Sequence, residues 1–188
     1  MQLTSSNLRN QLLIAMPALG DPNFFHTVTL ICEHNEEGCF GVTINRPLDM
    51  TVGDLLKQLD IDSIEQVVLD ATAVNGGPVQ PNQGFVIHDT SQSWQGTLHV
   101  GDNLSVTSSR DILEDIAVGK GPDNFLLALG CASWSAGQIE DELRQNAWLT
   151  CPASHQILFE TPYEQRWQQS AGTLGVDVNL ISDVVGHA

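Results

Sequence analysis

Residues 32–47, CEHNEEGCFGVTINRP, form the centre of a predicted β-hairpin, and the rest of the fold can be worked out from it. The two runs His26–Glu33 and Cys39–Asn45 are rich in β-forming residues. A short loop that contains glycine joins them, which is the spacing of a hairpin. We therefore expect two antiparallel strands on either side of residues 35–38.

The register of this hairpin raises the question of a metal site. With the loop at residues 35–38, His34 pairs with Cys39. Two residues earlier, Cys32 pairs with Gly41, so the two cysteines and the histidine share one face of the sheet. A fourth zinc ligand could come from His26 or Cys131. The spacing C-x-H-x4-C matches no common zinc motif, however, and isolated cysteines in strands are usually small buried hydrophobic residues. We therefore expect no metal here.

The remaining sequence mixes strands and helices in irregular order. Thr51–Leu59 predicts a helix that begins with a capping box, and Arg110–Val118 predicts a second helix. The continuous apolar run Phe125–Leu129 predicts a central strand that ends at Gly130. Hairpins interleaved with helices indicate the α+β class, and the absence of repeats and linkers indicates a single domain over residues 1–188. Further expected elements are strands at Gln66–Leu69 and Gly84–His88, a hairpin of Gly96–Val100 with Leu104–Thr107, and helices near Trp134–Gln145 and from Thr161 onward.

Acidic residues dominate the charge of the chain. Twenty-three Asp and Glu residues against seven Lys and Arg give a formal net charge of −16. Phosphate backbones and anionic lipids are bound by clustered Lys and Arg, whereas the seven cations here are scattered along the sequence. The composition therefore argues against direct nucleic-acid binding.

The sequence also bears on the compartment in which the protein works. No run approaches the roughly 18 apolar residues that span a bilayer. The N-terminus lacks the basic and apolar regions of a signal peptide. The four cysteines (Cys32, Cys39, Cys131 and Cys151) are too few for a disulfide scaffold. We expect a cytoplasmic protein with reduced thiols and no membrane association.

Cys131 is the best placed candidate nucleophile. It follows the predicted strand at a sharp turn, and the N-terminus of a following helix would lower the pKa of its thiol. The surrounding residues do not match G-x-S-x-G, and a turn with a small buried cysteine is the simpler interpretation. A hydrolase that uses Cys131 or His34 is therefore the alternative to a non-catalytic protein. We expect the carboxylates of residues 140–142 to lie on a solvated helix face.

The glycines of residues 75–79 (NGGPV) raise a similar choice. Successive N–H groups in such a segment can form a nest for an anion, although the segment can equally be only a turn. The chain contains neither a Walker A motif nor G-x-G-x-x-G, so we expect no nucleotide and no other cofactor.

Four segments in order resemble the YqgE/AlgH family of bacterial proteins, and the resemblance covers nearly the whole chain. The segments are LIAMPALGDP (residues 13–22), E-H-N (33–35) running to N-R-P (45–47), G-G-P-V (76–79) running to GFVIH (84–88), and LGCASWSAGQIEDELRQNAW (129–148). The resemblance implies a compact α+β domain with a mixed, partly barrel-like sheet flanked by several helices. It implies no established biochemical activity. One member is named for a proposed role in transcriptional regulation of alginate synthesis, which the acidic charge here makes indirect.

The chain departs from the family pattern at its cysteines. The pattern does not require cysteine at positions 32 and 39, and it usually has tyrosine where this chain has Cys131. These departures count against a thiol or metal chemistry shared by the family.

We expect the chain to bind a small ligand or a protein partner. Arg46 is a rare cation in an acidic protein and can attract an anionic group. Alternatively, Arg46 pairs with a carboxylate such as Glu33 and locks the hairpin to a neighbouring loop. The candidate binding residues, chosen because they match the family motifs, are Glu33, His34, Asn45, Arg46, Gly76, Gly77, Pro78, His88, Trp134 and Gln138.

Overall fold

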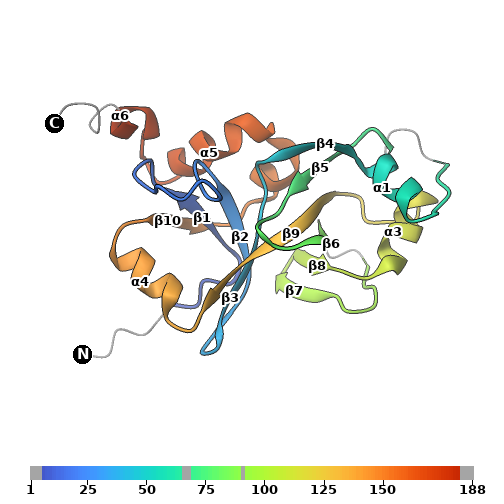
Figure 1. Cartoon of the computed structure of the whole chain (residues 1–188), viewed down its shortest axis with the longest axis horizontal. Coiled ribbons are helices and arrows are strands. Elements are labelled where there is room, and N and C mark those ends of the chain that lie inside the picture. The colour runs from blue at the N-terminus through green and yellow to red at the C-terminus, as the bar shows by residue number, and fades with distance from the viewer. Residues whose placement is uncertain (1–5, 65–68, 90–91, 183–188) are drawn as a thin grey trace.

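The long strand β9 (Phe125–Ser135) organises the sheet in the computed structural model, which describes residues 6–64, 69–89 and 92–182. It pairs antiparallel with β3 (Gly38–Thr43) and β6 (Val79–His88), and parallel with β5 (Thr72–Asn75). Figure 1 shows β9 crossing the middle of the molecule between the N-terminal strands and those of the central third of the chain. The apolar run at its start is therefore central, as its composition predicts.

The other strands extend the sheet on both sides of β9 in the order β10-β1-β2-β3-β9-β6-β8-β7. The strands β4 and β5 lie off this path. Among the described strands β10 and β7 do not pair, so the sheet is mixed and open, and the partly barrel-like closure that we expected is not established. The remaining strands are β1 (Gln11–Ala15), β2 (Val28–Asn35), β4 (Pro47–Thr51), β7 (Leu98–Gly101), β8 (Leu104–Thr107) and β10 (Trp148–Pro152).

Strand β9 continues through Gly130, where the sequence predicted its end. Gly130 has φ of +80°, which L side chains rarely adopt. At this point β9 crosses close to the Gly76-Gly77 segment. A Cβ atom on Gly130 would lie 2.5 Å from the carbonyl oxygen of Gly77, and one on Gly76 would overlap the carbonyl oxygen of Gly130. The glycine therefore permits a close backbone crossing, and it does not end the strand.

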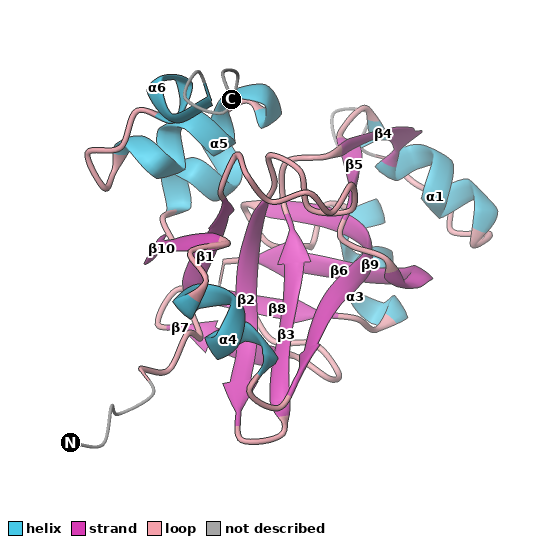
Figure 2. Ribbon diagram, turned by 60° about the vertical axis from the view of Figure 1, so that its left-hand side comes forward, coloured by secondary structure: helices cyan, strands magenta, loops and turns pink. Residues whose placement is uncertain are grey.

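The helices cover both faces of this sheet and bury three apolar clusters. Helices α1 (Val52–Gln58) and α3 (Arg110–Ala117) enclose one cluster, and α4 (Gln138–Arg144) covers a second. The largest cluster lies between the strands and the C-terminal elements. These elements are the π-helix η1 (Gln156–Glu160), α5 (Tyr163–Gly172) and α6 (Val178–Ser182). Figure 2 shows α5 and α6 together at one end of the sheet and α1 at the other.

The predicted starts and ends of the elements agree with the structure in some places and differ in others. The capping box at the start of α1 is present, with reciprocal bonds between Thr51 and Asp54. Helix α5 begins at Tyr163 with Pro162 as its N-cap residue, and the Thr161 hydroxyl, which the sequence offered as the cap, donates instead to the carbonyl of Gln156. The strand expected at Gln66–Leu69 lies outside the described residues, apart from its last position. No helix in the described ranges is both long enough and apolar enough to cross a bilayer.

Candidate functional site

A β-bulge in the hairpin of β2 and β3 separates the residues that the sequence placed on one face. His34 pairs with Cys39 as expected, but Ile31 takes the place opposite Gly41 because Cys32 is the extra residue of the bulge. Cys32 packs in the largest cluster, whereas Cys39 packs with Ile31 in the cluster under α4. No group of three or more His, Cys, Asp or Glu side chains suited to a metal occurs in the parts of the chain that the structure describes. The prediction that Cys32, His34 and Cys39 share one face of the sheet is wrong, because the bulge places Cys32 and Cys39 in different clusters.

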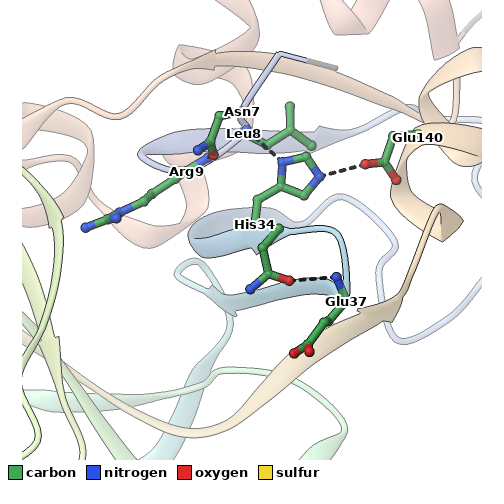
Figure 3. Close-up of polar contacts among 7 residues, drawn as sticks. Asn7, Leu8, Arg9, His34, Glu37 and Glu140 are labelled. Atoms are coloured by element: carbon green, nitrogen blue, oxygen red, sulfur yellow. Dashed lines mark hydrogen bonds and ion pairs between the residues drawn. The ribbon is translucent and has the colours of Figure 1, made fainter. Parts of the chain in front are cut away.

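The imidazole of His34 is held between the N-terminal segment and α4 (Figure 3). The backbone N–H of Leu8 donates to Nδ1 at 3.1 Å, and Nε2 lies 2.7 Å from Oε1 of Glu140. Since Nδ1 accepts a hydrogen bond, this geometry assigns the proton of the neutral ring to Nε2, which donates to the carboxylate. The side chain is only 5% exposed. The unprotonated nitrogen, Nδ1, thus already accepts a hydrogen bond from Leu8, and His34 is not available as a general base.

The contact with His34 affects the pKa of the Glu140 carboxyl. Burial, the largest influence, raises the pKa of its carboxyl, but the hydrogen bond from His34 and the nearby charges outweigh it and leave the pKa below its ordinary value. The second oxygen, Oε2, is buried without a hydrogen-bond partner among the described residues. The sequence analysis put residues 140–142 on a solvated face and so missed this pair. Glu140, Asp141 and Glu142 are consecutive acidic residues, and nothing in the sequence distinguishes the one that pairs with His34.

Glu142 gathers three further side chains at the inner face of α4. Its Oε2 accepts from the indole nitrogens of Trp134 at 3.0 Å and Trp148 at 2.7 Å, and its Oε1 accepts from Gln138 at 3.0 Å. The Phe24 ring stacks on Trp134 with centroids 5.9 Å apart and meets Trp148 edge-on. Two candidate binding residues, Trp134 and Gln138, are therefore brought together, with their donors directed at one carboxylate.

Asn45 and Arg46 hold the loop between β1 and β2. Asn45 accepts from the N–H of Val28 at 2.8 Å and donates to the carbonyl of His26 at 2.9 Å. The Arg46 guanidinium donates to three loop carbonyls at 2.8–3.0 Å, those of Pro22, Asn23 and Phe25. The lock between hairpin and loop that we considered is present, but carbonyl groups accept the hydrogen bonds and Glu33 takes no part.

The candidate glycines lie beside this loop. Gly76 exchanges backbone hydrogen bonds with Thr43 and Leu129, both at 2.8 Å. Gly77 and Pro78 line a pocket of only about 30 Å³ together with Arg46. A nest of free N–H groups is therefore not formed at Gly76 and Gly77, because the Gly77 N–H donates to Asn75 and the Gly76 N–H to Leu129.

His88 lies apart from the other candidates and is fully buried. Its Nδ1 lies 2.5 Å from the carbonyl of Asp89, which can only accept, so Nδ1 carries the proton. Its Nε2 then accepts from the hydroxyl of Thr107 at 2.8 Å. Burial lowers the pKa of His88, which agrees with a neutral ring fixed on both sides.

Glu33 is exposed near the turn of the β2–β3 hairpin. It lines a shallow depression of about 220 Å³ with Trp134 and Gly38. The candidates thus fall into separate groups: Glu33 and His34 with Trp134 and Gln138 around α4, Asn45 and Arg46 with the glycines at the loop, and His88 on β6.

All four cysteines are buried, which bears on the nucleophile hypothesis. Burial raises the pKa of every one of these thiols, that of Cys39 to about 12. Cys131 lies in the middle of β9 and is 3% exposed, so it does not sit at a helix N-terminus. The physical basis for an activated Cys131 is therefore removed.

A cavity of about 660 Å³ lies in a region that the sequence did not single out. The turn between β7 and β8 forms one side, with Asp102 and Leu104, and the π-helix with Leu158 forms another. Asn10 also lines it, in the left-handed conformation with φ of 65°. The remaining lining residues are Asp89, Gly101, Asn103, Ala153, Ser154, His155 and Phe159.

Two of these features recur at functional sites. Single-turn π-helices and non-glycine residues at positive φ both cost stability and are often retained for function. A side chain at Gly101 would collide with Asn10, so the lining is closely fitted there. In the sequence, Gly101-Asp102-Asn103 indicates only the turn of the predicted hairpin between Gly96–Val100 and Leu104–Thr107. Its meeting with the π-helix depends on the tertiary structure.

The fold and these internally bonded side chains define a single compact α+β protein built on one mixed open sheet. The model of the AlgH-like family matches residues 12–179, and the chain belongs to this family, whose biochemical function is not established.

Several relatives match this chain over its full length. UPF0301 proteins of Xanthomonas axonopodis pv. citri and Xanthomonas campestris pv. campestris are each 50% identical over 188 residues, with all of both chains covered. The solution structure of AlgH from Pseudomonas aeruginosa has a TM-score of 0.80 at 45% identity, again over all of both chains. A crystal structure of a Corynebacterium diphtheriae protein, with a TM-score of 0.75 at 20% identity over 97% of this chain and 94% of that one, shares the fold.

Proposed function

We propose that this chain is a non-catalytic binding module whose small ligand occupies the 660 Å³ cavity between the β7–β8 turn and η1. The cavity itself carries the proposal, because its volume is in the range of small-molecule sites and it combines apolar walls with a few convergent polar groups. The cytoplasmic location and the indirect regulatory role that we expected are part of this proposal. The acidic charge of −16 supports an indirect role, without nucleic-acid contact.

The family-matching residues have a different role in this proposal. The polar groups of His34, Asn45, Arg46, His88 and Trp134 are engaged in bonds within the chain. Such groups would have to give up these bonds to hold a ligand. We propose that they maintain the fold and that the ligand binds at the cavity. No observation favours the hydrolase alternative, since Cys131 is buried in a strand and His34 has no free nitrogen lone pair.

A fragment screen monitored by backbone amide NMR shifts tests the proposal. We expect bound fragments to shift the amides of Gly101–Leu104 and of η1. The matched variants are Ala153→Leu, which fills the cavity from its lining, and Ala18→Leu in an exposed turn away from it. Ala153→Leu should abolish the shifts, whereas Ala18→Leu should keep them. Fragments that shift only the surroundings of Glu33 or Arg46, or no fragment binding at the cavity, would overturn the proposal.

A further inference from the structure

We propose that Asn75 is a covalent modification site whose reaction is suppressed in the native fold and starts when the crossing of β9 over the Gly76-Gly77 segment opens. The reaction is deamidation, in which the side-chain amide nitrogen is lost as ammonia. Asn75 is the only asparagine in the chain that is followed by glycine. The backbone nitrogen of a glycine is the least hindered one that can follow an asparagine, because glycine has no Cβ atom.

The reaction proceeds within the chain and consumes only water. The backbone nitrogen of Gly76 loses its proton and attacks Cγ of Asn75. A nitrogen–carbon bond forms, the bond from Cγ to Nδ2 breaks, and Nδ2 takes up the proton and leaves as ammonia, so that a five-membered succinimide remains. Water then opens either imide bond. Cleavage at Cγ gives aspartate at position 75, and cleavage at the backbone carbonyl carbon gives isoaspartate, in which the chain continues through the side chain.

The native hydrogen bonds hold both reacting groups away from this step. The Gly76 N–H donates to the carbonyl of Leu129 at 2.8 Å, and the Asn75 N–H donates to the carbonyl of Arg46 at 2.8 Å. Oδ1 of Asn75 accepts from the N–H of Gly77 at 3.1 Å. An intramolecular attack needs the reacting atoms aligned at about 3 Å. The Gly76 nitrogen must therefore give up its bond to Leu129 before it can react.

Packing at the crossing prevents the rotation that would align the two groups. Gly76 is buried, and its backbone lies so close to Gly130 that a Cβ atom there would overlap the Gly130 carbonyl. The Asn75 residue is exposed, so water reaches it while the attacking nitrogen is enclosed. Deamidation therefore requires local or global opening, and its rate follows the population of the open form.

The two hydrolysis products differ in whether the chain can regain its fold. Aspartate at position 75 leaves the backbone unchanged and keeps an oxygen that can accept from Gly77. Isoaspartate adds a methylene group to the backbone before Gly76, at a crossing where neither Gly76 nor Gly77 has room for a Cβ atom. The isoaspartate chain cannot close the crossing, so this product is a permanent mark of unfolding.

Peptide mapping by mass spectrometry after incubation at mildly alkaline pH tests the proposal. We expect deamidation of Asn75 to be at least about tenfold slower in the native protein than in urea, because only the open form reacts. Asn146, which is followed by alanine, is the internal control and should react far more slowly than Asn75 in urea. Equal rates at Asn75 in native buffer and in urea would overturn the protection. A denatured chain in which Asn75 reacts no faster than Asn146 would overturn the reactivity.

Two glycine variants test the role of the crossing. Gly130→Ala strains the crossing itself and should accelerate deamidation of Asn75 in native buffer. Gly172→Ala lies in α5, where a Cβ atom meets open space, and should not accelerate it. A folded Gly130→Ala protein that deamidates at the wild-type rate would contradict the proposal.

Refolding of the wild type provides a test that needs no variant. After incubation in urea, dilution returns the chains to native buffer, and size-exclusion chromatography separates the folded chains from the rest. We expect the folded fraction to contain aspartate at position 75 and to be depleted in isoaspartate. The same ratio of the two products in both fractions would show that the crossing tolerates the longer backbone, which the proposal excludes.

Discussion

At the scale of single residues, carboxylates on α4 determine what the candidate side chains can do. Glu142 accepts both indole N–H groups and Glu140 accepts the His34 N–H, so these residues fix a helix to the sheet. A buried donor that loses its acceptor keeps its desolvation cost without compensation. The residues that look most functional in the sequence are thus part of the packing of α4.

Glu142→Ala should destabilise the protein by about 2–4 kcal/mol, because it leaves the Trp134 and Trp148 indoles and the Gln138 amide without their acceptor. Urea unfolding followed by tryptophan fluorescence measures the change. Glu114→Ala is the control, since Glu114 makes an exposed pair with Arg110 that contributes roughly 0–1 kcal/mol. Similar effects of the two variants would show that the indole contacts are not stabilising.

The Glu140 carboxyl should make stability depend on pH. Its pKa is lower in the folded protein than its ordinary value of 4.5, so the unfolded chain takes up the proton first on acidification. Its contribution is therefore complete above the ordinary pKa and is lost as the pH falls through the lowered one. We expect the difference in unfolding free energy between the wild type and Glu140→Gln to be smaller at pH 3 than at pH 7. An equal difference at both pH values would contradict the assignment.

At the scale of elements, the crossing of β9 over the Gly76-Gly77 segment is the feature on which the sheet depends. The crossing brings β3, β5 and β6 together around one strand, and it requires glycine where backbones approach closely. A periodicity argument cannot detect this requirement, because the glycine in β9 has the same appearance in sequence as a strand end.

Gly130→Ala should destabilise the fold by at least about 1–3 kcal/mol, because it combines a positive φ with a clash against the Gly77 carbonyl. Gly172→Ala provides the opposite case. Gly172 lies in α5, and the space that a Cβ atom would occupy there is open, so alanine should stabilise the protein by up to about 1 kcal/mol. Thermal unfolding of both variants measures the difference, and a neutral Gly130→Ala would refute the close crossing.

At the scale of the whole molecule, the open sheet buries nearly every group that the sequence offered for catalysis. Cys32, Cys39, Cys131 and Cys151 are each at most 6% exposed, and they are distributed over two apolar clusters. The residues that line the 660 Å³ cavity come instead from turns and from the π-helix, at ends of strands that are distant in sequence.

The four thiols should therefore report on global unfolding. We expect a thiol reagent at neutral pH to react with all four cysteines slowly in the native protein, at rates that rise together with the denatured fraction, because burial raises their pKa values. Reaction followed at increasing urea concentrations provides the measurement. One cysteine that reacts rapidly in the native state would revive the nucleophile hypothesis.

The sequence by itself determined the α+β class, the β2–β3 hairpin with its His34–Cys39 pair, the capped start of α1 and the family, because these depend on local periodicity, turn chemistry and motif order. The tertiary structure decided the bulge at Cys32, the passage of β9 through Gly130, the carboxylate partners of His34 and Trp134, and the position of the cavity. Each of these features depends on contacts between segments that are distant in sequence. Such contacts are determined by the packing of the complete chain, and the local pattern of any one segment does not indicate them.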